Sequence, residues 1–206
     1  ILFMEPDTYL TIKSFSEGLY KEKGSRFISL AYPVADQEEI KGILSQVKKE
    51  HHSARHHCFA WMLGHERSNY RVNDDGEPSG SAGKPILGQI NAFQVTNILI
   101  IVVRYFGGKL LGVSGLINAY RTAAGSALIN NEILEHHVLD HYELTFPYSA
   151  MNDVMKLVKE EEAGQSEQSF GLECRLTISF RRASGERILS SLERISDLKY
   201  VMKGTF

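Results

Sequence analysis

The apolar positions in the first two thirds of the chain predict several strands. Ile98–Val103 is an unbroken aliphatic run, which is typical of a strand covered on both faces. Cys58–Leu63 is equally apolar and predicts a second buried strand, with Trp61 in the core. The shorter strands that the pattern predicts lie at residues 9–12, 15–20, 26–34 and 70–72. Together these segments indicate one sheet with buried central strands.

Helical periodicity appears between these strands. Asp36 with Glu39 three residues later forms a capping box at the start of an amphipathic helix. A short helix is expected over Ile86–Phe93, beginning near Pro85, because proline is tolerated at a first helical position. A third helix is predicted with Ser114 as its N-cap.

The pattern changes after residue 140, where strands alternate apolar and polar positions. Residues 142–146 and 172–180 read as half-exposed strands, and 151–158 and 188–195 as amphipathic helices. With short strands near 168–170 and 200–202, the order is β-α-β-β-α-β, which is the ferredoxin-like arrangement. We therefore predict the α+β fold class, with two domains at residues 1–138 and 139–206. The solvated face of the second sheet is a candidate surface for a protein partner.

The charged residues are unevenly distributed along the chain. The 206 residues carry a net charge of −2, so the molecule as a whole is not a polycation. Between Glu77 and Glu132, however, there is no acidic residue. The cations in that interval are Lys84, Arg104, Lys109 and Arg121. If these side chains share a face, they form a positive patch.

Cysteine use and hydropathy exclude several classes of protein. Cys58 and Cys174 are far apart and lack metal-ligand spacing, so neither a disulfide framework nor a zinc ribbon is indicated. No signal peptide and no apolar run of about 18 to 20 residues is visible. We expect a cytoplasmic protein that does not bind membranes and needs no cofactor or metal.

The segment after the central strand is a candidate site for anions. A buried strand followed by a glycine-rich turn and a helix N-terminus favours phosphate or other anions. The candidate residues are Arg26, Lys84, Arg104, Tyr105, Gly107, Gly108, Lys109 and Ser114. The cations would contact phosphates, and the tyrosine ring would stack on bases. The alternative is a tight turn whose glycines serve packing alone. Phe106 is expected in the core.

A second candidate site combines histidines with an acidic loop. His56 and His57 precede a buried strand, and Asp74, Asp75 and Glu77 follow later. Neighbouring strand residues point to opposite faces, so at most one histidine joins a given site. These groups could bind a metal or supply the acid and base of a hydrolase. Alternatively, the acids only order their own loop through turn hydrogen bonds.

Four blocks of this sequence resemble the YigZ/IMPACT family. They are KGSRFI at 23–28, HHCFAW at 56–61, DDGEPSGSAGKPIL at 74–87 and VVRYFGGKLLGVSGLINAY at 102–120. The family's motif loop corresponds here to His57, Asp74, Asp75, Gly76, Glu77, Pro78, Gly80 and Gly83. Ser114 stands where the family usually has a third glycine, and Asn118 where it often has an arginine. The second change removes one positive charge from the predicted basic face.

The resemblance implies a fold and a field of function. Its first domain would be similar to a ribosomal-protein domain also seen in GHMP kinases, and its second to the C-terminal domain of elongation factor G. Eukaryotic relatives carry an additional N-terminal domain and modulate an amino-acid-starvation kinase. We do not expect that domain in this sequence, so their role should not transfer whole.

These observations lead to a main hypothesis and an alternative. The main hypothesis is an RNA-binding or ribosome-associated protein with a translation-linked regulatory role, with DNA as a further candidate ligand. The alternative is a metal-dependent hydrolase or phosphate-ligand enzyme that uses the DDGEPSG loop and His57. No nucleophile motif decides whether the protein is an enzyme.

Overall fold

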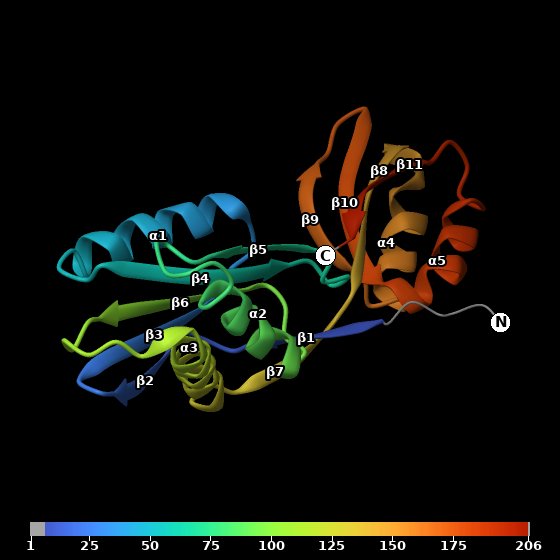
Figure 1. Cartoon of the computed structure of the whole chain (residues 1–206). Helices are drawn as coiled ribbons and strands as arrows, with labels where there is room; N and C mark the ends of the chain where they lie inside the picture. The colour runs from blue at the N-terminus through green and yellow to red at the C-terminus, as the bar shows by residue number, and fades with distance from the viewer. Residues whose placement is uncertain (1–6, 206) are drawn as a thin grey trace. The chain divides into compact units, whose positions relative to one another are not determined.

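The computed structural model describes residues 7–205 as a mixed α+β protein (Figure 1). Its contacts divide the chain into two compact units. One unit is Tyr9–His136, and the other runs from His137 onward and includes Asp7 and Thr8. Each unit has its own sheet and its own hydrophobic core. We describe them separately as the first and the second unit.

The first unit is built on a five-stranded antiparallel sheet with the order β2-β3-β6-β4-β5. These strands are β2 (Ser16–Glu22), β3 (Ser25–Pro33), β6 (Ile98–Tyr105), β4 (His56–Leu63) and β5 (Asn69–Asn73). The central position of β6 agrees with its unbroken apolar run, because a central strand is buried on both faces. The predicted strands of this region are confirmed, with ends that differ by a few residues.

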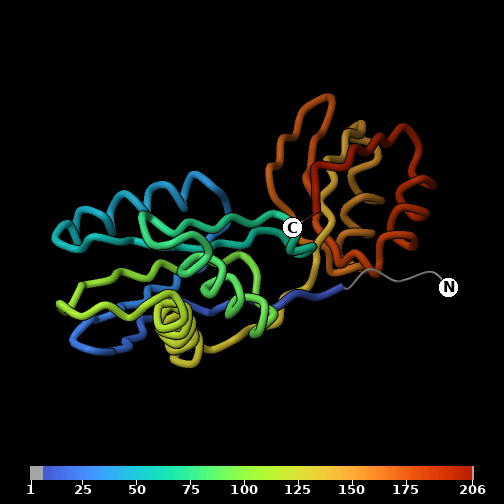
Figure 2. Tube along the Cα trace, in the orientation of Figure 1, coloured from blue at the N-terminus to red at the C-terminus, as the bar shows by residue number. Residues whose placement is uncertain are grey.

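Helices cover both faces of this sheet (Figures 1 and 2). They are α1 (Gln37–Glu50), α2 (Gly83–Ala92) and α3 (Gly112–Ile129). Ile98, Ile100 and Val102 of β6 pack in the cluster that contains α2 and α3 residues. The alternate residues of β6 pack with α1 instead. The α1 face and the α2/α3 face of the sheet are thus distinguished by the parity of each strand position.

The helix starts follow the predictions in part. Asp36 caps α1 by accepting hydrogen bonds from the amides of Glu38 and Glu39. The predicted N-cap role of Ser114 is wrong, because α3 begins at Gly112 and its N-cap residue, Leu111, makes no side-chain cap. The amides of the first turn of α3 therefore lack a side-chain acceptor.

A small two-stranded sheet pairs β1 (Thr8–Ile12) with β7 (Ile133–His137). The strand β1 was predicted, whereas β7 was missed because its sequence, ILEHH, does not alternate. None of the helices in the described part of the chain is long and apolar enough to cross a membrane.

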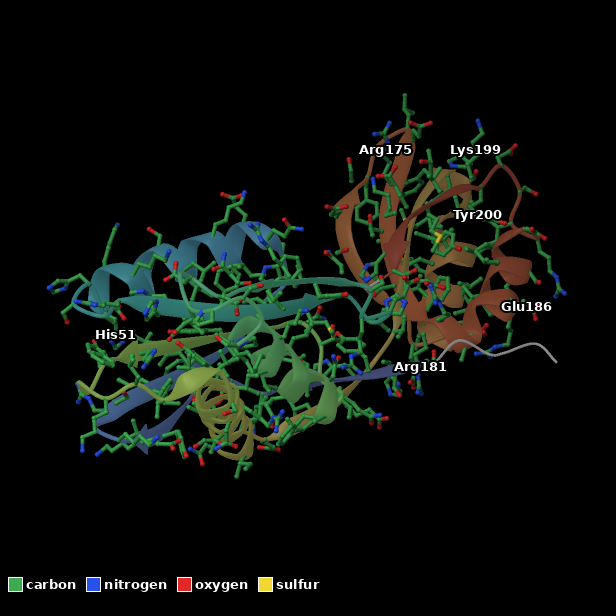
Figure 3. All side chains as sticks on the ribbon, viewed as in Figure 1. His51, Arg175, Arg181, Glu186, Lys199 and Tyr200 are labelled. Atoms are coloured by element: carbon green, nitrogen blue, oxygen red, sulfur yellow. The ribbon has the colours of Figure 1, made fainter. Side chains whose placement is uncertain are left out.

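The second unit has the order β-α-β-β-α-β that the sequence predicts. Its elements are β8 (Leu139–Pro147), α4 (Met151–Glu160), β9 (Gly164–Ser169), β10 (Glu173–Arg181), α5 (Gly185–Leu192) and β11 (Lys199–Thr205). They form an antiparallel sheet with the order β11-β8-β10-β9. Leu172 was expected in the third strand, but it precedes β10 and is fully exposed. Arg175 and Lys199 of this sheet are also exposed (Figure 3).

Candidate functional site

The register of the first sheet brings three site residues into one row. His56 of β4 lies opposite Arg104 of β6, and Phe27 of β3 lies opposite Arg104 on the other side. All three share the strand parity of the α2/α3 face. The guanidinium of Arg104 lies 5.5 Å from the ring centroid of Phe27 and 5.5 Å from that of Phe106. Such cation–π contacts hold the guanidinium in position.

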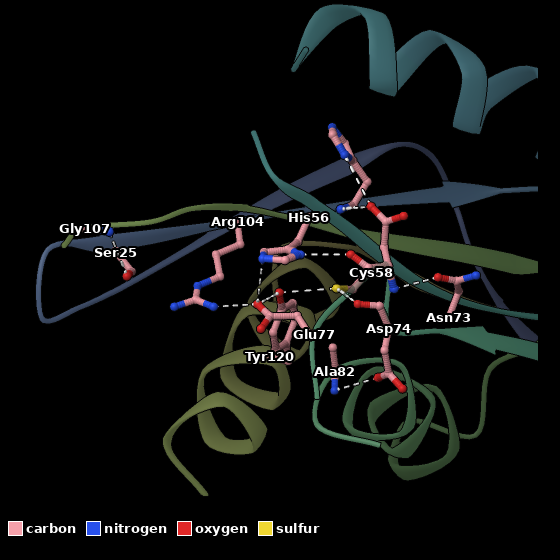
Figure 4. A network of polar contacts seen from close by, with 12 residues as sticks. Ser25, His56, Cys58, Asn73, Asp74, Glu77, Ala82, Arg104, Gly107 and Tyr120 are labelled. Carbon is pink, nitrogen blue, oxygen red and sulfur yellow. Dashed lines mark hydrogen bonds and ion pairs between the residues drawn. The ribbon is translucent and has the colours of Figure 1, made fainter. Parts of the chain in front are cut away.

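Glu77 joins this row from the loop between β5 and α2 (Figure 4). Its Oε1 accepts hydrogen bonds from Arg104 Nη1 at 2.6 Å and from the Tyr120 hydroxyl at 2.7 Å. The Nε2 atom of His56 lies 4.0 Å from the same oxygen. The side chains of Glu77 and Arg104 are only 4% and 7% exposed. They form a buried ion pair, in which each charge neutralises the other.

This burial corrects two sequence predictions. Arg104 was expected to contact phosphates from the surface, but its residue is 5% exposed and its charge is paired with Glu77. Phe106 was expected in the core, but it is 46% exposed. The strand pattern could not show that Arg104 is buried and Phe106 exposed, because the partner of Arg104 is 27 residues away in the sequence.

Asp74 organises the loop that carries Glu77. Its carboxylate accepts hydrogen bonds from the backbone amides of Gly80, Ala82 and Gly83. Burial alone would raise the pKa of Asp74, but these three hydrogen bonds outweigh it and lower the pKa. Asp74 therefore orders its own loop through hydrogen bonds, as the alternative interpretation predicted, and its negative charge is satisfied within the loop.

The buried thiol beside this cluster is not a nucleophile. Cys58 Sγ contacts the Tyr120 hydroxyl at 3.3 Å and donates to the carbonyl of Asp74 at 3.0 Å. Burial raises the pKa of the Cys58 thiol and of the Tyr120 hydroxyl. Both groups remain protonated at neutral pH, so neither can act as an anionic nucleophile.

His57 lies on the α1 face of the sheet, opposite the Glu77 cluster. Its Nε2 is within 3.2 Å of the His51 carbonyl, and its backbone amide donates to Asp75 Oδ2 at 2.7 Å. The alternative hydrolase hypothesis combined His57 with Asp74, Asp75 and Glu77 of the DDGEPSG loop. Asp75 does lie beside His57, with its Oδ2 3.7 Å from His57 Nδ1, whereas Glu77 lies beside His56 on the other face of the sheet. Among residues 7–205 no group of three or more potential ligands is placed to hold a metal ion.

The buried position of His57 predicts a pH dependence of stability. Burial lowers its pKa below the usual 6.5, although Asp75 opposes this shift. The unfolded chain therefore binds a proton near pH 6.5 that the folded chain binds only at lower pH. Below pH 6.5 the free energy of unfolding should fall with falling pH, by at most about 1.4 kcal/mol per pH unit for this one group.

Urea unfolding of wild type and His57→Gln between pH 5 and 8 tests this expectation. The variant should show a shallower decrease below pH 6.5. His52→Gln is the matched control, because His52 is exposed and should leave the decrease unchanged. Equal pH profiles for wild type and His57→Gln would contradict the assignment.

The loops at one end of the sheet meet through two glycines. Gly107 N donates to Ser25 Oγ at 3.1 Å, and a Cβ added at Gly107 would lie 1.9 Å from the carbonyl carbon of Gly24. We call the β2–β3 turn with its ends (residues 21–26) and the segment 105–112 together the loop edge. Within it, the guanidinium of Arg26 lies 4.9 Å from the ring centroid of Tyr105.

The remaining predicted residues lie in several elements of the first unit. Those that are exposed are Lys84, Gly107, Gly108, Lys109 and Ser114. Gly107, Gly108 and Lys109 belong to the loop edge, whereas Lys84 is on α2 and Ser114 is in the first turn of α3. Gly76 and Gly80 adopt positive φ in the loop around Glu77. The predicted anion-site residues are thus divided between a buried ion pair, the exposed loop edge and the first turns of α2 and α3.

A pocket of about 420 Å³ opens between the loop edge, the start of β4 and the start of α3. Its polar residues are Arg55, His56, Glu77 and Arg104. Pro78 and several apolar residues complete its wall. Of these residues, Arg55 and the apolar part were missed by sequence reasoning. Strand geometry predicted that His56 and His57 face opposite sides of the sheet, but not which helix covers the side of His56.

The fold and this site define an α+β protein with a buried Glu–Arg pair beneath a loop-lined pocket. The family profile described as the Impact N-terminal domain matches residues 23–128. A protein of Haemophilus influenzae described as an IMPACT family member is 32% identical over 199 residues, which cover 95% of this chain and 96% of that protein. The chain therefore belongs to the IMPACT family.

Two further relatives are similar over large parts of the chain. The Escherichia coli protein described as IMPACT family member YigZ is 38% identical over 138 residues, or 66% of this chain and 68% of that protein. A crystal structure described as that of a hypothetical protein matches with a TM-score of 0.76 and 29% identity, and covers 96% of this chain and 98% of its own. The arrangement in two units thus occurs in a solved structure.

Proposed function

We propose that the protein binds single-stranded RNA, free or within the ribosome, through the loop edge. The observation that carries this proposal is the contact of Gly24 with Gly107, which brings two cation-bearing loops together. The cations of the loop edge are Lys21, Lys23, Arg26 and Lys109, against one carboxylate, Glu22. Tyr105 and the exposed Phe106 add aromatic rings on which bases can stack.

The translation-linked part of the proposal is supported by membership of the IMPACT family. We extend it to a regulatory role in the cytoplasm, and to domains at 1–138 and 139–206 that are similar to a ribosomal-protein domain and to the C-terminal domain of elongation factor G. A protein partner on the sheet of the second unit is compatible with its exposed side chains, which include Arg175 and Lys199.

Fluorescence anisotropy with a labelled single-stranded RNA tests the proposal. Three or four phosphate contacts give a salt slope of about −2 to −3 for single strands, so a fourfold rise in salt should weaken binding about 20- to 50-fold. Arg26→Ala/Lys109→Ala should weaken binding at low salt and flatten this slope. We choose Arg26 rather than Arg104, because Arg104 is buried and its removal would also disturb the fold.

Lys13→Ala/Lys41→Ala is the matched control, because it removes the same charge from exposed positions. Lys13 precedes β2 and Lys41 lies near the start of α1, which follows β3, so both are toward the end of the sheet opposite the loop edge. It should bind RNA almost like wild type. Equal losses in the two double variants would show unspecific attraction by charge. If the wild-type protein binds no RNA, the proposal is wrong.

A further inference from the structure

The pocket beside the loop edge has the size and wall of a small-molecule site. Its volume of about 420 Å³ lies within the roughly 300–1,000 Å³ of ligand pockets. The apolar wall consists of Phe106, Leu110, Leu111, Val113 and Leu116. Leu110 is 84% exposed and Val113 is 53% exposed, so this apolar surface faces solvent. A ligand with an apolar body would cover it.

The polar part of the pocket carries a net positive charge. Arg104 is neutralised by Glu77, whereas Arg55 makes no hydrogen bond or ion pair with any residue that the structure describes. Two arginines and one glutamate therefore leave one positive charge. Because the chain has no acidic residue from 78 to 131, the rest of the wall cannot offset it.

Arg104 also has hydrogen-bonding capacity that the fold does not use. Its Nε is buried and has no partner within residues 7–205, and its hydrogen bond to Glu77 uses Nη1 alone. Since the residue is 95% buried, such donors are costly to leave unsatisfied. Arg104 lines the pocket, so a ligand there has an available donor group.

The start of α3 adds a second attraction for anions. Gly112 and Val113, its first two residues, line the pocket. The helix has neither a side-chain cap nor an acidic residue in its first turn. Its free amides and the positive end of its dipole therefore act on whatever occupies the pocket.

We propose that this pocket binds a small organic anion with an aliphatic or aromatic body. Its carboxylate or phosphate group meets Arg55, Arg104 and the N-terminus of α3, and its body packs against Phe106 and the leucines. Phe106 and residues 110–112 belong to both the pocket and the loop edge, whereas Arg55, the Glu77–Arg104 pair and Val113 belong to the pocket alone. Binding of a small anion can therefore be measured without RNA and fails or holds separately from the proposed function.

Titration calorimetry with simple probes tests this site in the full chain. We would compare 3-phenylpropionate and phenyl phosphate, which share an aromatic body and a negative charge, with the neutral 3-phenylpropanamide. At least one anion should bind saturably, and the amide at least tenfold more weakly. The stronger of the two anions identifies carboxylate or phosphate as the preferred head group.

Val113→Asp separates binding from folding. A carboxylate in the first turn of a helix favours the helix, so the thermal midpoint should stay level or rise. The same charge in the pocket should weaken binding of the anion at least tenfold. Val113→Asn, of nearly equal size but neutral, should bind within about threefold of wild type, since it adds no charge. No saturable binding of either anion, equal affinity for the amide, or undiminished binding by Val113→Asp would each overturn the proposal.

Discussion

Replacing Glu77 with alanine is expected to lower the free energy of unfolding by about 3–5 kcal/mol, because it leaves a buried guanidinium without its counter-charge. The side chain of Arg104 is only 7% exposed, and its Nη1 loses a 2.6 Å hydrogen bond. Tyr120 loses its acceptor at the same time. Urea unfolding followed by circular dichroism measures the change.

Two comparisons make this prediction specific. Glu66→Ala, at an exposed position before β5, should change the free energy of unfolding by less than about 0.5 kcal/mol. The double variant Glu77→Leu/Arg104→Met removes both charges and should be more stable than Glu77→Ala, because no unpaired charge remains. A Glu77→Ala protein as stable as Glu66→Ala would mean that the pair is not buried in solution.

Replacing Gly107 with alanine is expected to lower the free energy of unfolding by about 3 kcal/mol, the upper part of the range for overpacking. The new Cβ would lie 1.9 Å from the carbonyl carbon of Gly24 and 2.2 Å from the amide nitrogen of Ser25. Both are backbone atoms, so no side-chain rotation relieves the overlap. The two loops must separate, and RNA binding at the loop edge should weaken as well.

Gly42→Ala is the matched control for this substitution. Gly42 lies inside α1, and an added Cβ would meet nothing within 4 Å. Alanine should therefore raise the free energy of unfolding by about 0.5–1 kcal/mol, through the better helix propensity of alanine. A similar small effect of both substitutions would show that the loops do not touch as described.

The two predictions concern one structural arrangement. The Glu77–Arg104 pair fixes the end of β6 from the α2/α3 face, and the Gly24–Gly107 contact fixes the loop that follows. The exposed residues between them, among which is Phe106, line the pocket and the loop edge. The shape of the pocket and of the loop edge thus depends on these two contacts.

Local sequence determined the elements. The apolar runs of β4 and β6 and the alternation around Leu176 predicted strands, and the Asp36–Glu39 box predicted the start of α1. These signals can be read because burial imposes a period of 2 on half-exposed strands and of 3.6 on helices. The order β-α-β-β-α-β of the second unit followed from the same periods. The N-cap prediction for Ser114 was wrong, because a good N-cap residue can also stand within a first turn.

Only the tertiary structure decided which groups share a site. The sequence showed that His56 and His57 face opposite ways, but the register of β4 on β6 placed His56, and not His57, beside Arg104 and Glu77. The tertiary structure also buries Arg104 and exposes Phe106, although arginine is usually exposed and phenylalanine usually buried. The physical reason is that a charge can be buried when a partner distant in sequence neutralises it. Such a pairing leaves no local pattern from which it could be predicted.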